Sequence, residues 1–271
     1  MKKFFLLMTA ILVFGAGGLV QPAAAETLRI GAECTYFPFN YRTDDGVLTG
    51  YDIDVARGIM EIIGADAKFV CQKWDGMIPA LLANKFDLIT ASMSITEERK
   101  KKMDFSIPYR ISVGQFVGKK GANLNLFNSD GSPNPANFKG VKMGLERATT
   151  YANWVEANIP DAKVLLYDTN EALYLDLQNG RTDIIMTNPM KAYLKFLSKD
   201  KGKKFGFVSP PLADPKFFGI GVGVGIAKGR EDLLKRINGA LKTLIENGSL
   251  EKYSLKYFPF AIHNENWEGV E

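Results

Sequence analysis

The sequence predicts an α/β protein of two lobes, and three observations lead to this fold class. Short β-rich apolar runs alternate with segments of helical periodicity, a pattern typical of repeated β-α-β units around a mainly parallel sheet. The alternation occurs twice, and a segment rich in Gly, Asn, Ser and Pro at 118–137 separates the two series. Without its first 25 residues the 271-residue chain is still long for one domain and natural for two.

The first series supplies the elements of a first lobe. Helical spacing of apolar residues predicts a helix over 53–63, ended by Gly64, and a second helix over 77–83. Strands are expected around them, at 27–31, 67–71 and 88–91.

The pattern changes after Arg110, where 111–117 indicates an extended strand that crosses to a second lobe. The second lobe is expected to contain strands and helices in alternation. Its predicted strands are 141–145, 163–167, 184–186 and 205–208, and its predicted helices are 170–178 and two that begin near 150 and 189.

The C-terminal part is expected to return to the first lobe. Gly219 to Ile226 alternates glycine with β-branched residues, which suits a strand whose glycine face lies against other backbone. An amphipathic helix from about 234 ends at Asn247-Gly248, and a short helix follows. The resulting domain boundaries are 26–111 and 209–271 for the first lobe and 112–208 for the second, with two connections that form a hinge.

The N-terminus indicates export. Lys2 and Lys3 precede an apolar stretch from Phe4 to about Val20, and small residues follow up to Ala25, so 1–25 is predicted to be a cleaved signal peptide. Three glycines weaken the alternative, a membrane anchor, which needs a longer unbroken apolar run. We therefore expect a periplasmic protein.

Composition excludes several function classes. The expected mature chain has 32 basic and 30 acidic residues, a charge too small to indicate a nucleic-acid partner. The single histidine, His263, lies in a polar tail. A Ser-His-Asp or Cys-His catalytic arrangement therefore has almost no candidate histidine. Metal-ligand and phosphate-loop motifs are absent from the sequence, so no metal or cofactor is expected. Carboxylate acid-base chemistry needs no such motif and remains open.

Cys34 and Cys71 are the two cysteines of the sequence. An oxidising compartment permits a disulfide between them, and closing a loop of this length contributes about 4 kcal/mol in the chain-entropy model. The sequence leaves the bridged and the free state open.

Five motifs occur in one order along the first part of the chain: Glu33-Cys-Thr-Tyr-Phe-Pro-Phe39, Gly50-Tyr-Asp-Ile-Asp54, Trp74-Asp-Gly-Met-Ile-Pro-Ala80, Ser92-Met-Ser-Ile-Thr-Glu-Glu-Arg99 and Asp104-Phe-Ser-Ile-Pro-Tyr109. Together they resemble the polar amino-acid branch of the periplasmic solute-binding proteins, which includes lysine/arginine/ornithine-, histidine- and glutamine-binding proteins. The resemblance implies the type II periplasmic binding protein fold, with two lobes of mixed sheet flanked by helices and a two-strand hinge. It also implies a monomer that delivers a small amino-acid ligand to an ABC permease.

The resemblance assigns ligand-binding roles to residues of the first lobe. Arg99 would hold the ligand α-carboxylate, since a guanidinium donates two charge-assisted hydrogen bonds to one carboxylate. Aromatic faces would sandwich the ligand side chain, and Glu33 would bind its far end. The expected first-lobe set is Glu33, Tyr36, Trp74, Ser92, Met93, Ser94 and Arg99, with the serines receiving the α-ammonium.

The second lobe is expected to contribute a loop that enters a helix. Thr149 and Thr150 would offer hydroxyl and N–H groups to the ligand carboxylate, and Tyr151 would line one wall. Glu146 could reach the ligand or point to solvent. At position 188 the sequence departs from the family, because Asn188 stands where an aspartate usually neutralises the α-ammonium. Either another acid compensates, or the ligand's α-nitrogen is substituted or absent.

The expected function is the capture of a polar, cationic amino acid such as arginine, lysine, ornithine or histidine, without catalysis. Glutamine or an opine-type derivative is the alternative ligand. A periplasmic cyclohexadienyl dehydratase on the same fold is the alternative of a different class, because fold alone does not fix function. A sensory role is a third reading.

Overall fold

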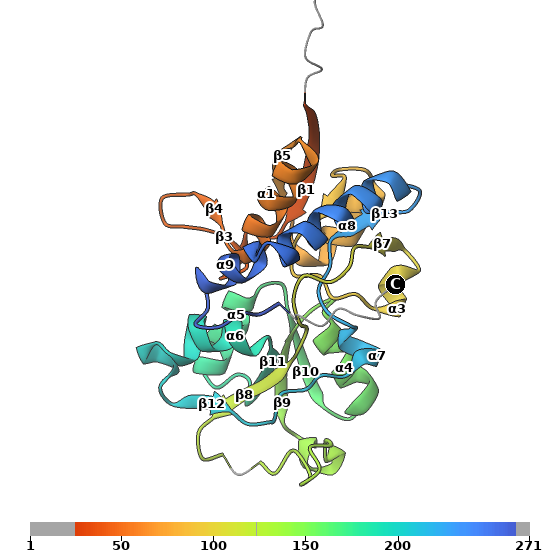
Figure 1. Ribbon diagram of the computed structural model, residues 1–271. Coiled ribbons are helices and arrows are strands. Elements are labelled where there is room, and N and C mark those ends of the chain that lie inside the picture. The colour runs from red at the N-terminus through yellow and green to blue at the C-terminus, as the bar shows by residue number, and fades with distance from the viewer. Residues whose placement is uncertain (1–24, 123, 264–271) are drawn as a thin grey trace, which may run out of the picture.

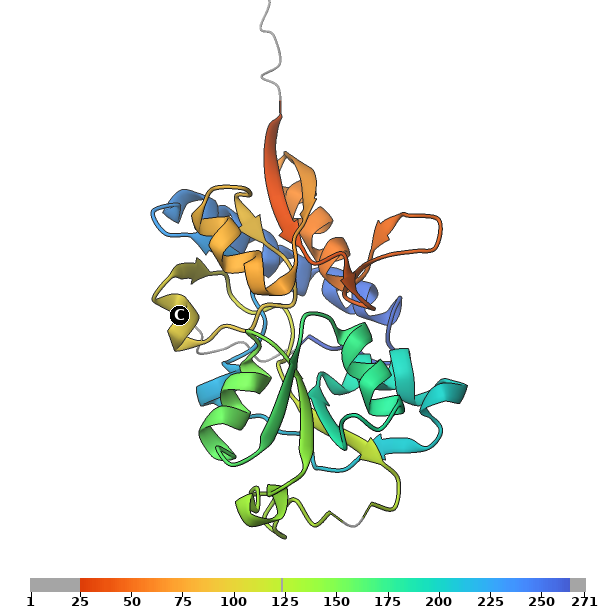
Figure 2. The same ribbon diagram turned by 180° about the vertical axis from the view of Figure 1, so that it is seen from behind.

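Two five-stranded sheets organise the chain, one in each of two lobes (Figure 1). This computed structural model describes residues 25–122 and 124–263. The predicted signal peptide therefore lies, except for Ala25, outside the described residues. The first lobe contains both the beginning and the end of the described chain, whereas the second lobe is built from its middle (Figure 2).

The first-lobe sheet has the strand order β5-β1-β6-β13-β7 and is mixed. β1 runs parallel to β5 and β6, and β13 runs antiparallel to β6 and β7. Its strands are β1 (Glu26–Ala32), β5 (Ala65–Cys71), β6 (Leu88–Ile89), β7 (Met103–Phe105) and β13 (Gly225–Ala227).

Helices cover this sheet because each has one apolar face. The longest, α8, packs against α1, and both contribute buried residues to the main core of the lobe. α1 ends where the sequence predicts, since Gly64 adopts the left-handed conformation at its C-terminus with φ 68°. The helices of this lobe are α1 (Tyr51–Ile63), α2 (Met77–Leu82), α3 (Glu97–Lys100), α8 (Glu231–Glu246) and α9 (Ser249–Leu255).

A small antiparallel sheet follows β1 and was not predicted from the sequence. Its strands have only two or three residues, too few for alternation to be visible. They are β2 (Thr35–Tyr36), β3 (Asn40–Arg42) and β4 (Leu48–Thr49).

The second-lobe sheet has the order β10-β9-β11-β8-β12. β9 runs parallel to β10 and β11, while the crossing strand β8 runs antiparallel to β11 and β12. The strands are β8 (Gln115–Lys119), β9 (Lys142–Glu146), β10 (Lys163–Tyr167), β11 (Ile184–Thr187) and β12 (Phe205–Phe207). The helices are α4 (Thr150–Asn158), α5 (Asn170–Gln178), α6 (Pro189–Ala192) and α7 (Pro215–Phe218).

The return to the first lobe occurs later than the expected boundary at residue 209. Leu212 pairs with Gly114 next to β8, and Phe218 at the end of α7 is buried in the core of the second lobe. The segment 209–218 thus belongs with the second lobe, because its apolar side chains are buried there.

The glycine-rich segment after α7 is in close contact with other backbone, as its sequence predicts. A Cβ at Gly219 would lie 1.8 Å from the carbonyl oxygen of Ile95, and one at Gly221 would lie 2.8 Å from that of Arg110. The regular strand is shorter than expected, because only Gly225–Ala227 continues the sheet and Val222 makes isolated bridges. In the described part of the chain, no helix is both long and apolar enough to cross a membrane.

Candidate functional site

A cavity between the lobes brings together all of the predicted site residues except Met93. Its walls come from the ends of β1 and β9, the starts of α4 and α6, and the crossing segment between the lobes. The residues that line it are Glu33, Tyr36, Trp74, Ala91, Ser92, Ser94, Arg99, Arg110, Ser112, Glu146, Thr149, Thr150, Tyr151 and Asn188.

Met93 was expected at the site, but its side chain packs in the core of the first lobe. It is 1% exposed and belongs to a buried cluster with Met77, Leu81 and Phe86. Ser92 and Ser94 line the cavity, whereas Met93 faces the core.

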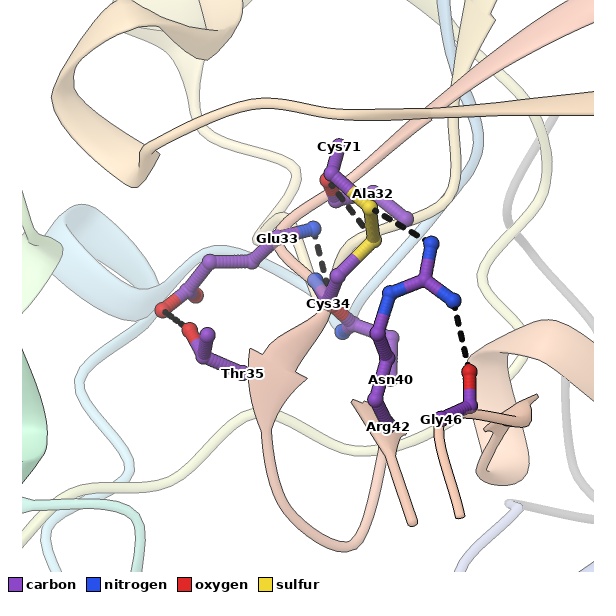
Figure 3. The surroundings of a disulfide bond; sticks show 8 residues. All are labelled: Ala32, Glu33, Cys34, Thr35, Asn40, Arg42, Gly46 and Cys71. Carbon is purple, nitrogen blue, oxygen red and sulfur yellow. Dashed lines mark hydrogen bonds between the residues drawn. A yellow bond between two sulfur atoms is a disulfide. The ribbon is translucent and has the colours of Figure 1, made fainter. Parts of the chain in front are cut away.

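The loop that carries Glu33 is fixed at both ends. Cys34 is bonded to Cys71 at the end of β5, with a Cα–Cα distance of 5.6 Å, and the Glu33 side chain points away from this disulfide (Figure 3). Thr35 donates a hydrogen bond to Glu33 Oε1 at 2.9 Å. The backbone N–H groups of Glu33 and Cys34 donate to Asn40 Oδ1. The disulfide and Asn40 therefore hold the Glu33 carboxylate in place.

Asp52 on α1 lies behind the first-lobe wall of the cavity and accepts hydrogen bonds from the residues that form or support this wall. Its side chain is fully buried and accepts hydrogen bonds from Asn40 Nδ2 at 2.7 Å, Ser92 Oγ at 2.7 Å and Tyr109 OH at 2.9 Å. Asp52 does not line the cavity, and no role was assigned to it from the sequence. The spacing in Gly50-Tyr-Asp-Ile-Asp54 signals it, because an aspartate on the buried face of a helix needs polar partners.

Arg99, the cation that the sequence predicts in the first-lobe wall, is buried. It is 9% exposed, its Nη1 donates to Ser94 O at 3.0 Å, and its guanidinium lies 5.4 Å from the centre of the Trp74 ring. Thr96 caps the short helix by accepting from the Arg99 N–H. Burial lowers the Arg99 pKa to about 10, so the side chain remains a cation at neutral pH.

The two predicted aromatic residues contact the second lobe directly. Trp74 Nε1 donates to Ala148 O at 3.1 Å. The Tyr36 ring faces an ammonium group of the second lobe, that of Lys191, whose Nζ lies 3.8 Å from the ring centre. Both aromatic rings therefore stabilise the arrangement in which the lobes lie close together.

The start of α4 forms the opposite wall. Thr149 caps the helix by accepting from the Ala152 N–H at 3.2 Å, and its hydroxyl donates to Glu146 O at 2.7 Å. Thr150 is the first residue of the helix, so its N–H group is one of those without an intrahelical partner. Tyr151 donates from its hydroxyl to Val113 O at 3.1 Å. A helix N-terminus here favours an anionic group of a ligand.

Glu146 and Arg147, two neighbours on the chain, point in different directions. Glu146 is 6% exposed, lines the cavity, and its Oε2 accepts from Asn170 Nδ2 at 2.5 Å. Arg147 forms an exposed ion pair with Asp168. Burial and the nearby Glu33 carboxylate raise the Glu146 pKa to about 8, and burial also raises the Glu33 pKa.

Asn188 is buried at the start of α6 and lines the cavity. Its Oδ1 accepts from the Lys191 N–H at 3.1 Å, which caps the short helix. The residue thus serves as a helix cap in addition to facing the cavity, and this oxygen is already engaged.

Sequence reasoning missed two buried cations at the site. Arg110 is 2% exposed, lies 4.3 Å over the Phe39 ring and lines the cavity. Lys191 is 1% exposed, and burial lowers its pKa. Arg110 follows the motif ending at Tyr109, but neither residue belongs to a motif that marks it as buried. Among the described residues, no cluster of three or more His, Cys, Asp or Glu side chains forms a metal site.

Comparison with known proteins identifies the family. The family model described as bacterial extracellular solute-binding proteins, family 3, matches residues 28–260. The chain belongs to this family. The family resemblance and the two-lobed type II periplasmic binding protein fold predicted from the sequence are thereby confirmed.

Named relatives in this family match over nearly their whole length. The L-arginine-binding protein of Pseudomonas aeruginosa is 37% identical, covering 98% of this chain and 100% of the relative. The histidine-binding periplasmic protein of Salmonella typhimurium is 32% identical, covering 97% and 99%. A crystal structure of an ancestral amino acid-binding protein, described as a precursor of cyclohexadienyl dehydratase, superposes with a TM-score of 0.71 at 31% identity, covering 86% of this chain and 95% of that one. This ancestral amino acid-binding protein thus shares the fold of the chain.

Proposed function

We propose that this protein captures a basic amino acid, arginine, lysine, ornithine or histidine, between its lobes in the periplasm and delivers it to an inner-membrane ABC permease. The family membership and the names of the arginine- and histidine-binding relatives support this class of ligand. The positive n-region and small-residue cleavage site at 1–25 support export. The protein is proposed to act as a monomer, without a cofactor.

The observation that carries the proposal is that Arg99 and the start of α4 line the same cavity from different lobes. Arg99 supplies a buried guanidinium, and Thr149 and Thr150 supply the N-terminus of a helix. Both favour a carboxylate, the group that every α-amino acid carries. The α-carboxylate would therefore bind between the lobes and contact each of them.

The far end of the cavity suits a polar nitrogen-bearing side chain. Glu33 and Glu146 line it from opposite lobes, and Tyr36 provides an aromatic face. Carboxylates accept hydrogen bonds from guanidinium, ammonium or imidazole N–H groups, and an aromatic face attracts a cation.

Asn188 favours a second candidate ligand, an opine-type derivative with a substituted α-nitrogen. An amide supplies no charge to an α-ammonium, and its oxygen is already bonded to the Lys191 N–H. A substituted α-nitrogen has fewer N–H groups than a free ammonium and would therefore need fewer hydrogen-bond acceptors.

The enzyme alternative is tested by turnover. The ancestral neighbour is described as a precursor of a dehydratase, yet the named relatives are binding proteins. We propose that this chain does not catalyse dehydration. Formation of phenylpyruvate from prephenate, or phenylalanine from arogenate, at a rate proportional to protein concentration would contradict this.

The binding proposal is tested by calorimetry on refolded, ligand-free protein with the four basic amino acids, glutamine and octopine. A ligand present at about 100 times its Kd should also stabilise the protein by about 2.7 kcal/mol. Arg99→Ala should weaken binding by about 30-fold or more, because removing one partner of a buried charge pair costs about 2 to 5 kcal/mol. Arg147→Ala is the matched control, since Arg147 adjoins the site but pairs with Asp168 in solvent. Unchanged affinity in Arg99→Ala would show that the site is assigned wrongly.

A further inference from the structure

Lys191 places a buried ammonium group beside the cavity. It is the third residue of α6 in the second lobe, its side chain is 1% exposed, and its Nζ lies 3.8 Å from the ring centre of Tyr36 in the first lobe. The charges of Glu33 and Glu146 both act on it, as they do on each other. Glu33, Tyr36 and Glu146 line the cavity, and Lys191 lies next to it, in contact with the Tyr36 ring.

Two polar atoms of these four side chains lack partners. Within residues 25–122 and 124–263, neither Lys191 Nζ nor Glu146 Oε1 makes a hydrogen bond, although both are buried. Lys191 also forms no ion pair with a carboxylate of the described residues, even though three glutamates, Glu33, Glu146 and Glu171, are close enough to influence its charge. Burying a donor or an acceptor without a hydrogen-bond partner costs free energy. The structure therefore contains a polar site that lacks partners.

A ligand group that is both an acceptor and a donor can complete this site. Lys191 can only donate, and each glutamate offers an acceptor oxygen, either in its carboxylate or in the carbonyl of its protonated carboxyl. A guanidinium or ammonium offers donors alone, so it would satisfy the glutamates but leave Lys191 unpaired and next to a second positive charge. A neutral imidazole, an amide or a ureido group offers an acceptor to Lys191 and a donor to Glu33 or Glu146.

We propose that Lys191 is a specificity-determining residue that donates a hydrogen bond to an acceptor on the ligand side chain. It thereby selects amino acids whose distal group carries both an acceptor and a donor. The proposal rests on the proposed function, in which Arg99 holds the α-carboxylate. Among the four basic amino acids it favours histidine, because the imidazole is mostly neutral above its pKa of about 6.5 and then has one donor and one acceptor nitrogen.

The test uses L-arginine and L-citrulline, which have the same shape but differ at one distal atom. Citrulline carries a carbonyl oxygen where arginine carries a guanidinium nitrogen, so it adds an acceptor and removes the charge. Calorimetry on refolded wild-type protein at pH 7.5 should give a Kd for citrulline at least about tenfold below that for arginine, because like charges brought together in a buried site oppose binding. Histidine should bind most tightly of the four basic amino acids.

Lys191→Met tests whether this residue causes the preference. Methionine fills a similar volume without charge or donor, so the arginine-to-citrulline Kd ratio should fall by about tenfold or more. Lys191→Gln, which keeps a donor, should retain part of the citrulline preference. The control is Lys195→Met, one turn further along the chain, whose Nζ lies 5.6 Å from the Phe37 ring centre; there the ratio should stay unchanged.

The outcomes separate this inference from the proposed function. Arginine binding as tightly as citrulline to the wild type, or a ratio unchanged by Lys191→Met, would overturn the role of Lys191 while leaving an amino-acid binder intact. If no amino acid binds the wild type at all, the proposed function fails and the inference falls with it. The wild-type comparison needs no substitution, so it is decisive even where a variant does not fold.

Discussion

The two sides of the cavity differ in how completely their polar groups are partnered. On the first-lobe side, Asp52 accepts three hydrogen bonds and Arg99 donates to Ser94 O. On the second-lobe side, in the part of the chain that the structure describes, Glu146 Oε1 and Lys191 Nζ have no partner. The first-lobe face is therefore largely partnered before a ligand arrives, with Arg110 Nε as an exception, whereas the second-lobe face has two unpartnered groups that a ligand could complete.

This difference indicates an order of events. A ligand would bind first to the preorganised first lobe, and closure would then bring Glu146, Thr149 and Lys191 to it. Closure is favoured only by the additional affinity that the ligand gains in the closed state. The unpartnered second-lobe groups are the ones that would gain such affinity. Arg110, at the end of the first part of the first lobe, resembles them because its buried Nε also lacks a partner among the described residues.

The largest effect is expected from Asp52→Ala. The substitution leaves buried polar groups of Asn40, Ser92 and Tyr109 without their partner, so the free energy of unfolding should fall by about 3 to 5 kcal/mol. Ligand affinity should fall as well, because Asn40 holds the Glu33 loop. Urea unfolding and calorimetry measure the two effects.

The matched variant in the second lobe is Asn170→Ala. Asn170 is also buried, and it bonds to Glu146 and Thr187. The substitution should lower the free energy of unfolding by only about 1 to 3 kcal/mol, because the side chain that is removed is a neutral amide and not a charged carboxylate. Equal destabilisation by the two substitutions would mean that the first-lobe wall is not the better organised one.

A pH-dependent effect is expected from Glu146→Gln. The folded-state Glu146 pKa of about 8 lies above the ordinary value of 4.5, so the folded state favours the protonated carboxyl. Its contribution to stability is fully present below the ordinary pKa and is lost as the pH rises through 8. One pKa unit corresponds to about 1.4 kcal/mol, which makes this loss on the order of a few kcal/mol.

Urea unfolding of the ligand-free protein between pH 5 and pH 9, about the window set by these two pKa values, checks this expectation. Glu146→Gln should become more stable relative to the wild type as the pH rises, because glutamine cannot ionise. Glu156→Gln is the control, since Glu156 is an exposed residue of α4. A stability difference between wild type and Glu146→Gln that does not change with pH would contradict the assigned environment of Glu146.

The same contrast explains what could be predicted from the sequence. The predicted first-lobe residues belong to motifs of contiguous residues, such as Ser92 to Arg99, so their order along the chain revealed their shared site. Lys191 acts through packing between distant segments, and its burial cannot be read from local pattern. Arg147 and Glu146 look alike as adjacent charged residues, and only the pleat of β9 and the turn after it send one inward and one to solvent.

The fold was predictable to a similar extent. Long elements such as α1 and α8 have a clear apolar periodicity, and Gly64 marked one boundary. The two- and three-residue strands β2 to β4 have too few residues to show a pattern, and their pairing depends on residues that precede and follow the turn. The late return of the chain at Phe218 depends on burial against Trp154 in the second lobe, at 6.4 Å between ring centres.

The smallest effect is expected from Trp74→Phe, which tests the contact between the two sides. Phenylalanine keeps an aromatic face for Arg99 but removes the indole N–H that donates to Ala148 O across the lobes. One neutral hydrogen bond contributes about 0.5 to 1.5 kcal/mol, so the affinity should fall roughly twofold to tenfold, mainly through faster ligand release.

The control is Trp154→Phe, which removes an indole hydrogen bond to Asp214 inside the second lobe. That variant should lose stability without losing affinity, because its hydrogen bond is present whether the lobes are open or closed. If both variants weaken binding equally, the Trp74 contact does not act by stabilising the closed arrangement.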